Sequence, residues 1–302
     1  MIEICDVTRR YGSSEALSGV SLNVEPGRLA AIVGPNGSGK TTLFKLVMGL
    51  MRPTAGTIGL WGDSALPRPT HVLGRVAGML DNHVPPAGIR LQALIDLKAA
   101  ATPHFDRYWC GELLRELPGV THKRRFGELS KGQRQWALAA VVLASRADLL
   151  VLDEPADGLD TAMRRRLLAL LRESVDERGA TVLIASHVLT DLERVADSVL
   201  VLQAGKVRLT GDLEDLRDQV REVEFSSELP PFAPADEVAV LATKSLADGT
   251  LAWLRRPDWD SGARQWPGER SRRSVGLEDL YLALVGKHET PSNTLQEIAQ
   301  CP

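Results

Sequence analysis

The chain has 302 residues, of which 44% are hydrophobic and 25% charged, and its formal net charge is −3. This composition is typical of a globular protein, no run approaches the ~18 apolar residues of a membrane span, and a slightly acidic chain has no overall attraction for nucleic acid or anionic membranes. The cysteines lie far apart without CxxC spacing (Cys5, Cys110 and Cys301), so neither disulfides nor a structural zinc site are expected, and a reducing cytoplasm fits.

The first part of the chain predicts strands around one helix. Two segments alternate like strands, and residues 13–19 are expected to form part of the loop between them. A continuous apolar run predicts a buried strand, and residues 43–51 have apolar side chains at helical spacing. The strands predicted here are 2–7, 20–24, 28–34 and 54–62.

The middle of the chain alternates strands with helices. Strands are predicted at 75–80, 148–155 and 180–187, helices at 131–145, 162–179 and 188–196, and a hairpin at 197–211. This alternation up to about residue 220 indicates an α/β domain with a mostly parallel sheet. Residues 83–128 interrupt it with a helix at 89–101, further helical pattern and no clear strand, which predicts an inserted helical subdomain.

Residues 34–41, GPNGSGKT, fit the P-loop pattern G-x-x-x-x-G-K-[ST] between a predicted buried strand and a predicted helix. The backbone N–H groups of such a loop point at phosphate oxygens, and the helix N-terminus adds partial positive charge. Lys40 is expected to neutralise the β- and γ-phosphates, and Thr41 to place its hydroxyl on Mg²⁺. A glycine-rich turn that contains Lys-Thr by coincidence is the alternative, which this context disfavours. The predicted nucleotide-binding residues of the segment are Gly34, Asn36, Gly37, Ser38, Gly39, Lys40, Thr41 and Thr42.

Two later strands end in polar side chains at the same edge of the predicted sheet. Asp153 can hold Mg²⁺ through its water shell, and Glu154 can act as a general base on the attacking water. Alone, this Asp-Glu pair is equally compatible with an ordinary strand-end turn, and the P-loop favours the functional interpretation. His187 is placed to contact the γ-phosphate or the attacking water, although a lone histidine is more often structural. The predicted catalytic residues are therefore Lys40, Glu154 and His187.

With Leu129-Ser130-Lys131-Gly132-Gln133, these motifs resemble the nucleotide-binding subunit of ATP-binding cassette (ABC) transporters over roughly residues 1–220. The resemblance implies a P-loop NTPase fold of ABC type, with a mixed sheet core, N-terminal antiparallel strands and the helical subdomain at about 83–128. It also implies ATP and Mg²⁺ as cofactors. Lys131 stands where many members have glycine.

Further roles are implied position by position. The LSxGQ element of the family presents its serine and glycine to the γ-phosphate held by a partner subunit, which points to Ser130 and Gly132, with Gln133 beside them. Ser130 is equally suited to cap a helix. Tyr11 resembles the aromatic that stacks on adenine, and otherwise it is a half-buried tyrosine at a strand end. Asp160 resembles the distal carboxylate of the loop at the dimer interface, and it can also cap the helix that follows.

Asp81 is the most specific feature of this chain. In the family, the strand about 40 residues after the P-loop ends in a glutamine that touches Mg²⁺ and leads into the helical subdomain. Here Asp81 is the best match to that position, and a carboxylate is a good ligand for a hard cation. The neighbouring Asn82 and His83 are expected to be loop residues that face the partner.

After residue 220 the pattern changes, and residues 221–288 predict a small α+β accessory domain, followed by a frayed tail at 289–302. Its strands are predicted at 222–227, 237–243 and 250–256, with a loop at 255–273 and a helix at 277–286. Arginines interleaved with Trp253, Trp259 and Trp266 raise the possibility of single-stranded nucleic-acid binding. Acidic residues interrupt that run, so a solvated hairpin or linker is favoured.

The sequence therefore predicts an ATPase subunit of an exporter-type ABC transporter with a separate transmembrane permease, at the cytoplasmic face of the membrane. One chain has one P-loop and one LSKGQ element, so complete sites require a head-to-tail homodimer. The alternative is a soluble ABC-type ATPase in DNA repair or translation, but the usual coiled-coil insertion or second cassette is not visible. A regulatory module that binds without hydrolysing is disfavoured by Glu154 and His187. The transported substrate is not predicted.

Overall fold

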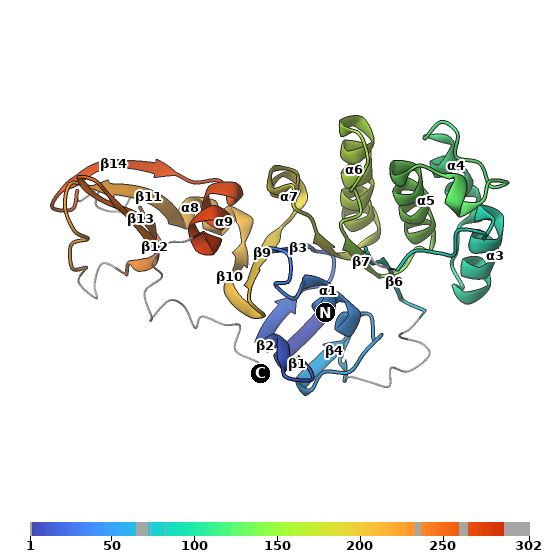
Figure 1. Ribbon diagram of the computed structural model, residues 1–302, viewed down its shortest axis with the longest axis horizontal. Helices are drawn as coiled ribbons and strands as arrows, with labels where there is room; N and C mark the ends of the chain where they lie inside the picture. The colour runs from blue at the N-terminus through green and yellow to red at the C-terminus, as the bar shows by residue number, and fades with distance from the viewer. Residues whose placement is uncertain are drawn as a thin grey trace.

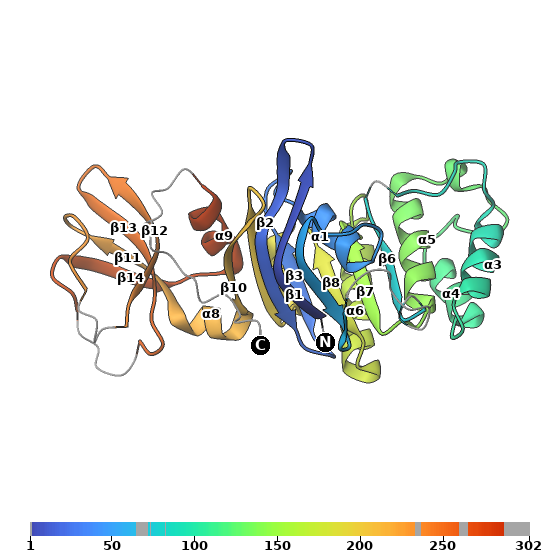
Figure 2. The same ribbon diagram turned by 90° about the horizontal axis from the view of Figure 1, so that it is seen from below.

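The computed structural model describes residues 2–64, 72, 74–81, 83–232, 237–259 and 265–286. The molecule is elongated, with a C-terminal sheet at one end and a helical region at the other (Figures 1 and 2). Two further sheets and the P-loop lie between these two ends. Asn82 and the predicted tail at 289–302 lie outside the described residues. No helix in the described ranges is long and apolar enough to cross a membrane.

A six-stranded sheet forms the centre, in the order β10-β9-β3-β8-β7-β6. Its strands are parallel except for the antiparallel edge strand β10. All five residues of β3, of β7 and of β8 are buried, which explains their continuous apolar sequences. The bounds are β3 Leu29–Val33, β6 Val76–Met79, β7 Leu149–Asp153, β8 Thr181–Ala185, β9 Ser198–Gln203 and β10 Lys206–Asp212.

A second, antiparallel sheet of β1 (Ile2–Tyr11), β2 (Ser14–Val24), β4 (Ala55–Leu60) and β5 (Asp63–Ser64) packs with α1 (Lys40–Val47) against one face of the central sheet. The prediction that residues 13–19 form a loop is wrong, because Ser14–Val24 is one continuous strand. Irregularities in the β1–β2 register interrupt the alternation of side chains, so the sequence pattern concealed the strand.

Helices α5 (Lys131–Ala144), α6 (Thr161–Arg178) and α7 (Leu189–Val195) lie on the opposite face of the central sheet (Figure 1). Gly179 ends α6 in the left-handed conformation, as predicted. In the helical region, α3 (Leu91–Ala101) and α4 (Arg107–Arg115) pack around α5, and the indole Nε1 of the buried Trp136 donates to the carbonyl of Leu113 at 2.6 Å. No strand occurs among the described residues of 83–128, as expected.

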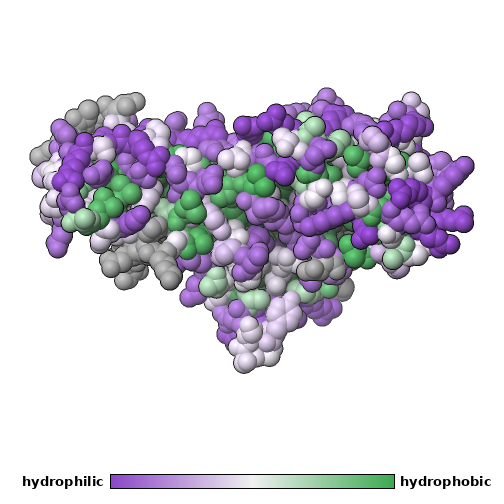
Figure 3. Space-filling view, turned by 45° about the horizontal axis from the view of Figure 1, so that its top comes forward, coloured by the Kyte–Doolittle hydropathy of each residue, from purple (hydrophilic) through white to green (hydrophobic). Residues whose placement is uncertain are grey.

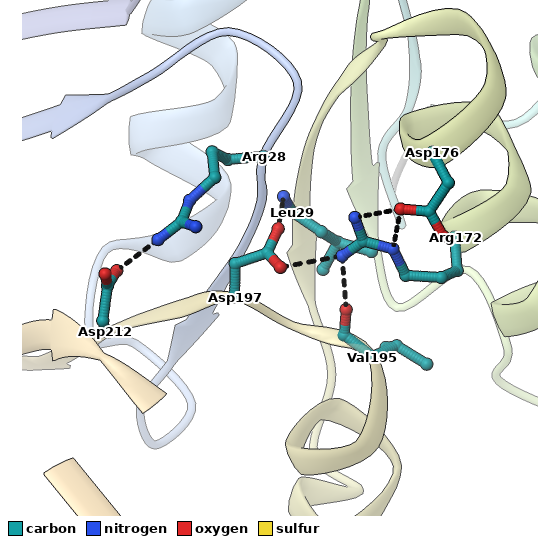
Figure 4. Close-up of polar contacts among 7 residues, drawn as sticks. All are labelled: Arg28, Leu29, Arg172, Asp176, Val195, Asp197 and Asp212. Carbon is teal, nitrogen blue, oxygen red and sulfur yellow. Dashed lines mark hydrogen bonds and ion pairs between the residues drawn. The ribbon is translucent and has the colours of Figure 1, made fainter. Parts of the chain in front are cut away.

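A polar network fixes the end of the central sheet that is remote from the P-loop (Figure 4). The carboxylate of Asp197 accepts a hydrogen bond from the backbone N–H of Leu29 at 2.7 Å and another from Arg172 at 2.9 Å. Arg172 also donates to the carbonyl of Val195, at the end of α7. The network therefore joins β3, α6, α7 and the start of β9. Nearby, Arg28 pairs with Asp212 at the end of β10.

The C-terminal sheet has the antiparallel order β12-β13-β11-β14. A short helix, α8 (Leu213–Gln219), leads into it, and α9 (Leu277–Val285) packs between the sheet and α7. The strands are β11 Val220–Phe225, β12 Ala239–Leu246, β13 Gly249–Arg255 and β14 Glu269–Ser274. The apolar cluster around α5–α7 continues through α9 to this sheet, so the division into domains at 220/221 stays a prediction.

The prediction of a loop throughout 255–273 is wrong, because β14 begins at Glu269. This edge strand is stabilised by cross-strand ion pairs, including Arg273 with Glu222 at 2.7 Å, rather than by apolar alternation. Trp253, Trp259 and Trp266 are 5–8% exposed, and Arg272 lies over the rings of Trp259 and Trp266. These three indoles pack inside the protein and are not available to stack on bases.

The cysteines differ from expectation in one respect. Cys5 is disulfide-bonded, so the prediction that the chain forms no disulfide is wrong. The separation of two cysteines along the sequence does not determine their distance in the fold, so neither their spacing nor their number shows which thiols can meet. Cys110 is a free thiol inside the helical region, where burial raises its pKa to about 12.

The face of the molecule shown in Figure 3 is mainly hydrophilic, with apolar residues in separate patches.

Candidate functional site

The P-loop connects β3 to α1 at the carboxyl edge of the central sheet. Gly39 has a φ of 110°, and a Cβ there would lie 2.7 Å from the carbonyl oxygen of Ala16. At Gly34, a Cβ would lie 2.2 Å from the carbonyl oxygen of Leu202. The loop packs too closely against β2 and β9 to carry side chains at these positions, so both glycines are required by the fold.

The loop borders a cavity of about 310 Å³. Lys40 projects along it, and its Nζ donates to the carbonyl oxygens of Gly34 at 2.6 Å and Pro35 at 3.1 Å. Burial lowers the pKa of Lys40, and the carboxylates of Glu154 and Asp153 oppose that shift. The cavity-lining residues are Ala16, Asn36, Gly37, Ser38, Gly39, Lys40, Thr41, Thr42, Asp81, Asp153 and Glu154.

Asp153 and Thr41 join the two nucleotide-binding motifs. The hydroxyl of Thr41 donates to Oδ2 of Asp153 at 2.6 Å, and Asp153 is only 2% exposed. Burial raises the pKa of Asp153 although the hydrogen bond from Thr41 and the charge of Lys40 lower it. Asp81 adjoins the pair, because its backbone hydrogen-bonds to Asp153 and its charge further raises the pKa of Asp153.

These oxygen donors suit a nucleotide-bound magnesium ion. No group of three or more His, Cys, Asp or Glu side chains that could hold a metal occurs in the described part of the chain. Mg²⁺ is usually held by one or two protein oxygens together with water and phosphate oxygens, which matches the Thr41–Asp153 pair. Ser38 Oγ, buried in the same loop, has no hydrogen-bond partner among the described residues and is available to a phosphate oxygen.

Glu154 and His187 are in direct contact at the ends of β7 and β8. Nδ1 of His187 lies 2.8 Å from Oε2 of Glu154, and the backbone N–H of His187 donates to the same oxygen at 3.3 Å. The Glu154 side chain is 20% exposed and that of His187 69%. Glu154 lines the cavity, whereas the largely exposed His187 is not part of that lining and contacts Glu154. The structure thus brings together the predicted catalytic residues Lys40, Glu154 and His187.

The other predicted nucleotide-binding residues do not line this cavity. Ser130 and Gln133 form a capping box at the start of α5, so the helix-cap interpretation of Ser130 is confirmed. Asp160 caps α6 by accepting from the N–H of Met163 at 2.8 Å, as its second interpretation predicted. Gly132 packs against the backbone of Gly158. Nucleotide contacts by Ser130, Gly132, Gln133 and Asp160 stay predictions.

Tyr11 also lies away from the cavity lining. Its ring is at the tip of the β1–β2 hairpin, 44% exposed, with the guanidinium of Arg9 4.8 Å from the ring centroid. Its hydroxyl donates to the sulfur of Met51 at 3.3 Å. Tyr11 is the last residue of β1, as the alternative expected, but its ring is exposed rather than half-buried. It is not part of the cavity wall, and stacking on adenine stays a prediction.

Two residues at the site were not predicted. Ala16 contributes to the cavity from β2, a segment that the sequence pattern had assigned to a loop. Gln135 is 8% exposed on α5, and its side-chain amide donates to the carbonyl of Glu154 at 3.1 Å. A polar residue at an inward-facing position of an otherwise apolar helix was the signal available for Gln135.

Residues 17–157 match the family model described as ABC transporter. The Nod factor export ATP-binding protein I of Burkholderia orbicola is 31% identical, over 95% of this chain and 97% of the relative. The corresponding protein of Burkholderia pseudomallei is 30% identical, with the same coverage. The bacitracin transport ATP-binding protein BcrA of Bacillus licheniformis is 29% identical over 68% of each chain.

Solved structures show the same fold. The ATP-binding subunit of an ABC transporter superposes with a TM-score of 0.66 at 29% identity, covering 72% of this chain and 92% of the other. A dimeric ATP-binding cassette in a post-hydrolysis state with ADP and Pi superposes with a TM-score of 0.64 at 22% identity, covering 70% of this chain and 99% of the other. At that identity, the second comparison supports the fold alone.

Replacing Asp153 with asparagine is expected to stabilise the nucleotide-free protein. Because burial raises the pKa of Asp153, the folded state binds a proton there more tightly than the unfolded chain. The cost of the buried charge is therefore present above the folded-state pKa and disappears as the pH falls through it. Asp153→Asn should raise the melting temperature by a few degrees at about pH 8, and by less at about pH 5.

The matched control is Asp148→Asn, which removes a carboxylate that is 52% exposed and paired with Arg75. It should change the melting temperature little at either pH. If Asp153→Asn is instead less stable at about pH 8, the attraction between Lys40 and Asp153 outweighs the cost of burial, and our interpretation of Asp153 is wrong.

Proposed function

The chain belongs to the ATP-binding subunits of ABC transporters, which are ATPases, and we propose that it powers export through a separate transmembrane permease. The observation that carries the catalytic assignment is that the P-loop, Asp153 and Glu154 line one cavity, with His187 bonded to Glu154. Export is supported by the relatives named for Nod factor export, and a transport role also by the relative named for bacitracin transport.

The residues at the cavity have distinct tasks in the transfer of a phosphoryl group from ATP to water. The P-loop backbone and Lys40 bind the phosphates, and Glu154 accepts the proton of the attacking water. Nδ1 of His187 lies within hydrogen-bond distance of Glu154, and this contact orients the carboxylate. When bound through Thr41 and Asp153, Mg²⁺ would neutralise negative charge on the phosphates.

We further propose that two copies assemble head to tail. Ser130, Gly132 and Gln133 lie outside the cavity bordered by the P-loop of their own chain. In the head-to-tail arrangement, these residues and Asp160 would complete the site of the partner copy. The helix start at Ser130 suits an anion, because its N–H groups and partial positive charge face outward. In this arrangement each copy binds one nucleotide with its P-loop cavity and the other nucleotide with the residues at the start of α5.

The membrane partner would bind the helical subdomain at about 83–128. Three large apolar side chains are exposed there, Val84 at 61%, Leu97 at 62% and Tyr108 at 78%. Large exposed apolar side chains are a feature of protein-binding surfaces. This arrangement would place the chain at the cytoplasmic face of the membrane, with residues 221–288 as an accessory domain at the far end. The buried indoles argue against single-stranded nucleic-acid binding by this domain.

Two individual assignments complete the proposal. Tyr11 would stack on adenine, for which its exposed ring at the hairpin tip is suited. Asp81 would contact Mg²⁺ directly or through water, since it lines the cavity beside Asp153. Either residue could move on nucleotide binding without disturbing the buried core.

The catalytic assignment is tested by Glu154→Gln, which keeps the shape of the side chain but removes the base. Steady-state ATPase turnover should fall about 100-fold or more, whereas equilibrium binding of ATP should persist. The control is Glu173→Gln, an exposed glutamate on α6, which should leave turnover unchanged. Undiminished ATPase turnover in the Glu154→Gln variant would contradict the assignment of Glu154 as the catalytic base.

The transport assignment is tested by purifying the full chain from detergent-solubilised membranes of its own organism. A membrane protein with several spans should co-purify in comparable amounts and alter the ATPase rate. Tyr108→Asp should weaken this association, and the control Leu246→Asp, on the C-terminal sheet, should not. Recovery of DNA or ribosomes in place of a membrane protein would favour the alternative function.

The metal assignment of Asp81 is tested by Asp81→Ala. The Mg²⁺ concentration needed for half-maximal ATPase activity should rise about 10-fold, because an anionic oxygen beside Asp153 is lost. ATP affinity measured in excess chelator should be unchanged. The control is His83→Ala, in the same exposed loop but outside the cavity lining. An unchanged Mg²⁺ requirement, or collapse of ATP binding in chelator, would contradict the assignment.

A further inference from the structure

The backbone of Glu154 is held in an unfavourable conformation. Its φ is 49°, in the left-handed region, which costs a residue other than glycine about 1–2 kcal/mol. Such a conformation persists only where surrounding contacts impose it. Three hydrogen bonds do so here, on both sides of the Cα atom. The N–H of Glu154 donates to the carbonyl of Ala185 at 2.9 Å. Its carbonyl accepts from the backbone N–H of Asp157 at 3.2 Å and from Nε2 of Gln135 at 3.1 Å, and only the Gln135 contact comes from a side chain.

The hydrogen bond from Gln135 comes from another structural element. Ala185 belongs to β8, the strand beside Glu154 in the sheet, so that contact extends the regular ladder. Gln135 lies on α5, and at 8% exposure its amide is almost fully buried. A buried amide donor without a partner costs about 1–3 kcal/mol, so the contact is maintained wherever α5 and Glu154 remain packed together.

Two more contacts join the first turn of α5 to the loop after Glu154. Nζ of Lys131 pairs with the carboxylate of Asp157 at 2.5 Å. Gly132 approaches Gly158 so closely that a Cβ on Gly132 would lie 2.4 Å from the carbonyl oxygen of Gly158. Residues 131–135 and 154–158 are therefore attached at three positions, so that a displacement of one segment would be transmitted to the other.

We propose that Gln135 is a positioning residue for Glu154, and that through it the first turn of α5 controls the orientation of the catalytic carboxylate. The inference rests on the proposed function, in which Ser130 and Gly132 contact the nucleotide held by the partner copy. Nucleotide at one site of the dimer then shifts α5, and Gln135 aligns Glu154 at the other site. Without Gln135, the backbone of Glu154 relaxes toward negative φ, and its carboxylate moves away from His187.

The test is Gln135→Met, which preserves side-chain length and approximate volume but removes the donor. In the purified full-length dimer with MgATP, kcat should fall about 10-fold to 100-fold, since small misplacements of a catalytic group have effects of this size. The KM for ATP should stay within about twofold, because the amide of Gln135 hydrogen-bonds to the backbone of Glu154 and not to the P-loop. A positioning role also predicts that the Hill coefficient for ATP falls toward one.

The control is Ser145→Ala, at the other end of the same helix. It also removes one buried hydrogen bond from a side chain to a backbone carbonyl, that of Val142, but far from Glu154. Its kcat and Hill coefficient should equal those of the wild type. Equal losses of kcat in both variants would show that any defect in α5 lowers activity, and would overturn the specific role of Gln135.

A double substitution separates positioning from general damage. If Gln135 acts through Glu154, then Gln135→Met should not further lower the single-turnover rate of Glu154→Gln. A further loss of about 10-fold would overturn the proposal. Should the methionine variant fail to fold, Gln135→Asn carries the same test, because its amide is polar but too short to reach the carbonyl.

The outcomes also distinguish this inference from the proposed function. Normal turnover by Glu154→Gln would overturn the catalytic assignment itself. An inactive Glu154→Gln together with a fully active, folded Gln135→Met would leave that assignment intact and overturn only the role of Gln135.

Discussion

The hydrogen bond between Thr41 and the buried carboxylate of Asp153 is the contact on which the site depends. It joins the first residues of α1 to the end of β7, two elements that the chain separates by more than a hundred positions. Asp153 keeps this place although burial opposes its charge, because Thr41 and Lys40 both stabilise the ionised form. The parallel sheet makes the arrangement possible, since it directs the ends of β3, β7 and β8 to one edge.

The same edge also explains why part of the site could be predicted from sequence. The P-loop, Asp153, Glu154 and His187 each follow a buried strand, and a run of apolar residues is a strong local signal for such strands. Once three strands are parallel neighbours, their carboxyl ends must meet. The pairing of His187 with Glu154 at 2.8 Å follows from that topology. The fold of the central domain was predictable for this reason.

What could not be predicted depends on contacts between segments that are distant in the chain. The bulged register of β1 and β2 hides a strand, and β14 is held by arginine–glutamate pairs that resemble a solvated loop in sequence. Gln135 looks like any polar residue of a helix until the structure places Glu154 beside it. The disulfide of Cys5 was missed for a related reason, because spacing in sequence says nothing of proximity in space.

Helix α7 connects the catalytic edge to the C-terminal part of the chain. His187 leads directly into α7, and Glu193 of that helix accepts a hydrogen bond from the N–H of Leu277, the first residue of α9. Arg217 of α8 donates to the carbonyl of Glu193 at 2.8 Å. Arg172 anchors the same C-terminal end of α7, because it donates to the carbonyl of Val195 and to Asp197. These contacts fix the C-terminal end of α7, the helix that follows His187 in the chain. Helices α8 and α9, which flank the C-terminal sheet, thus hold the helix that begins just after His187.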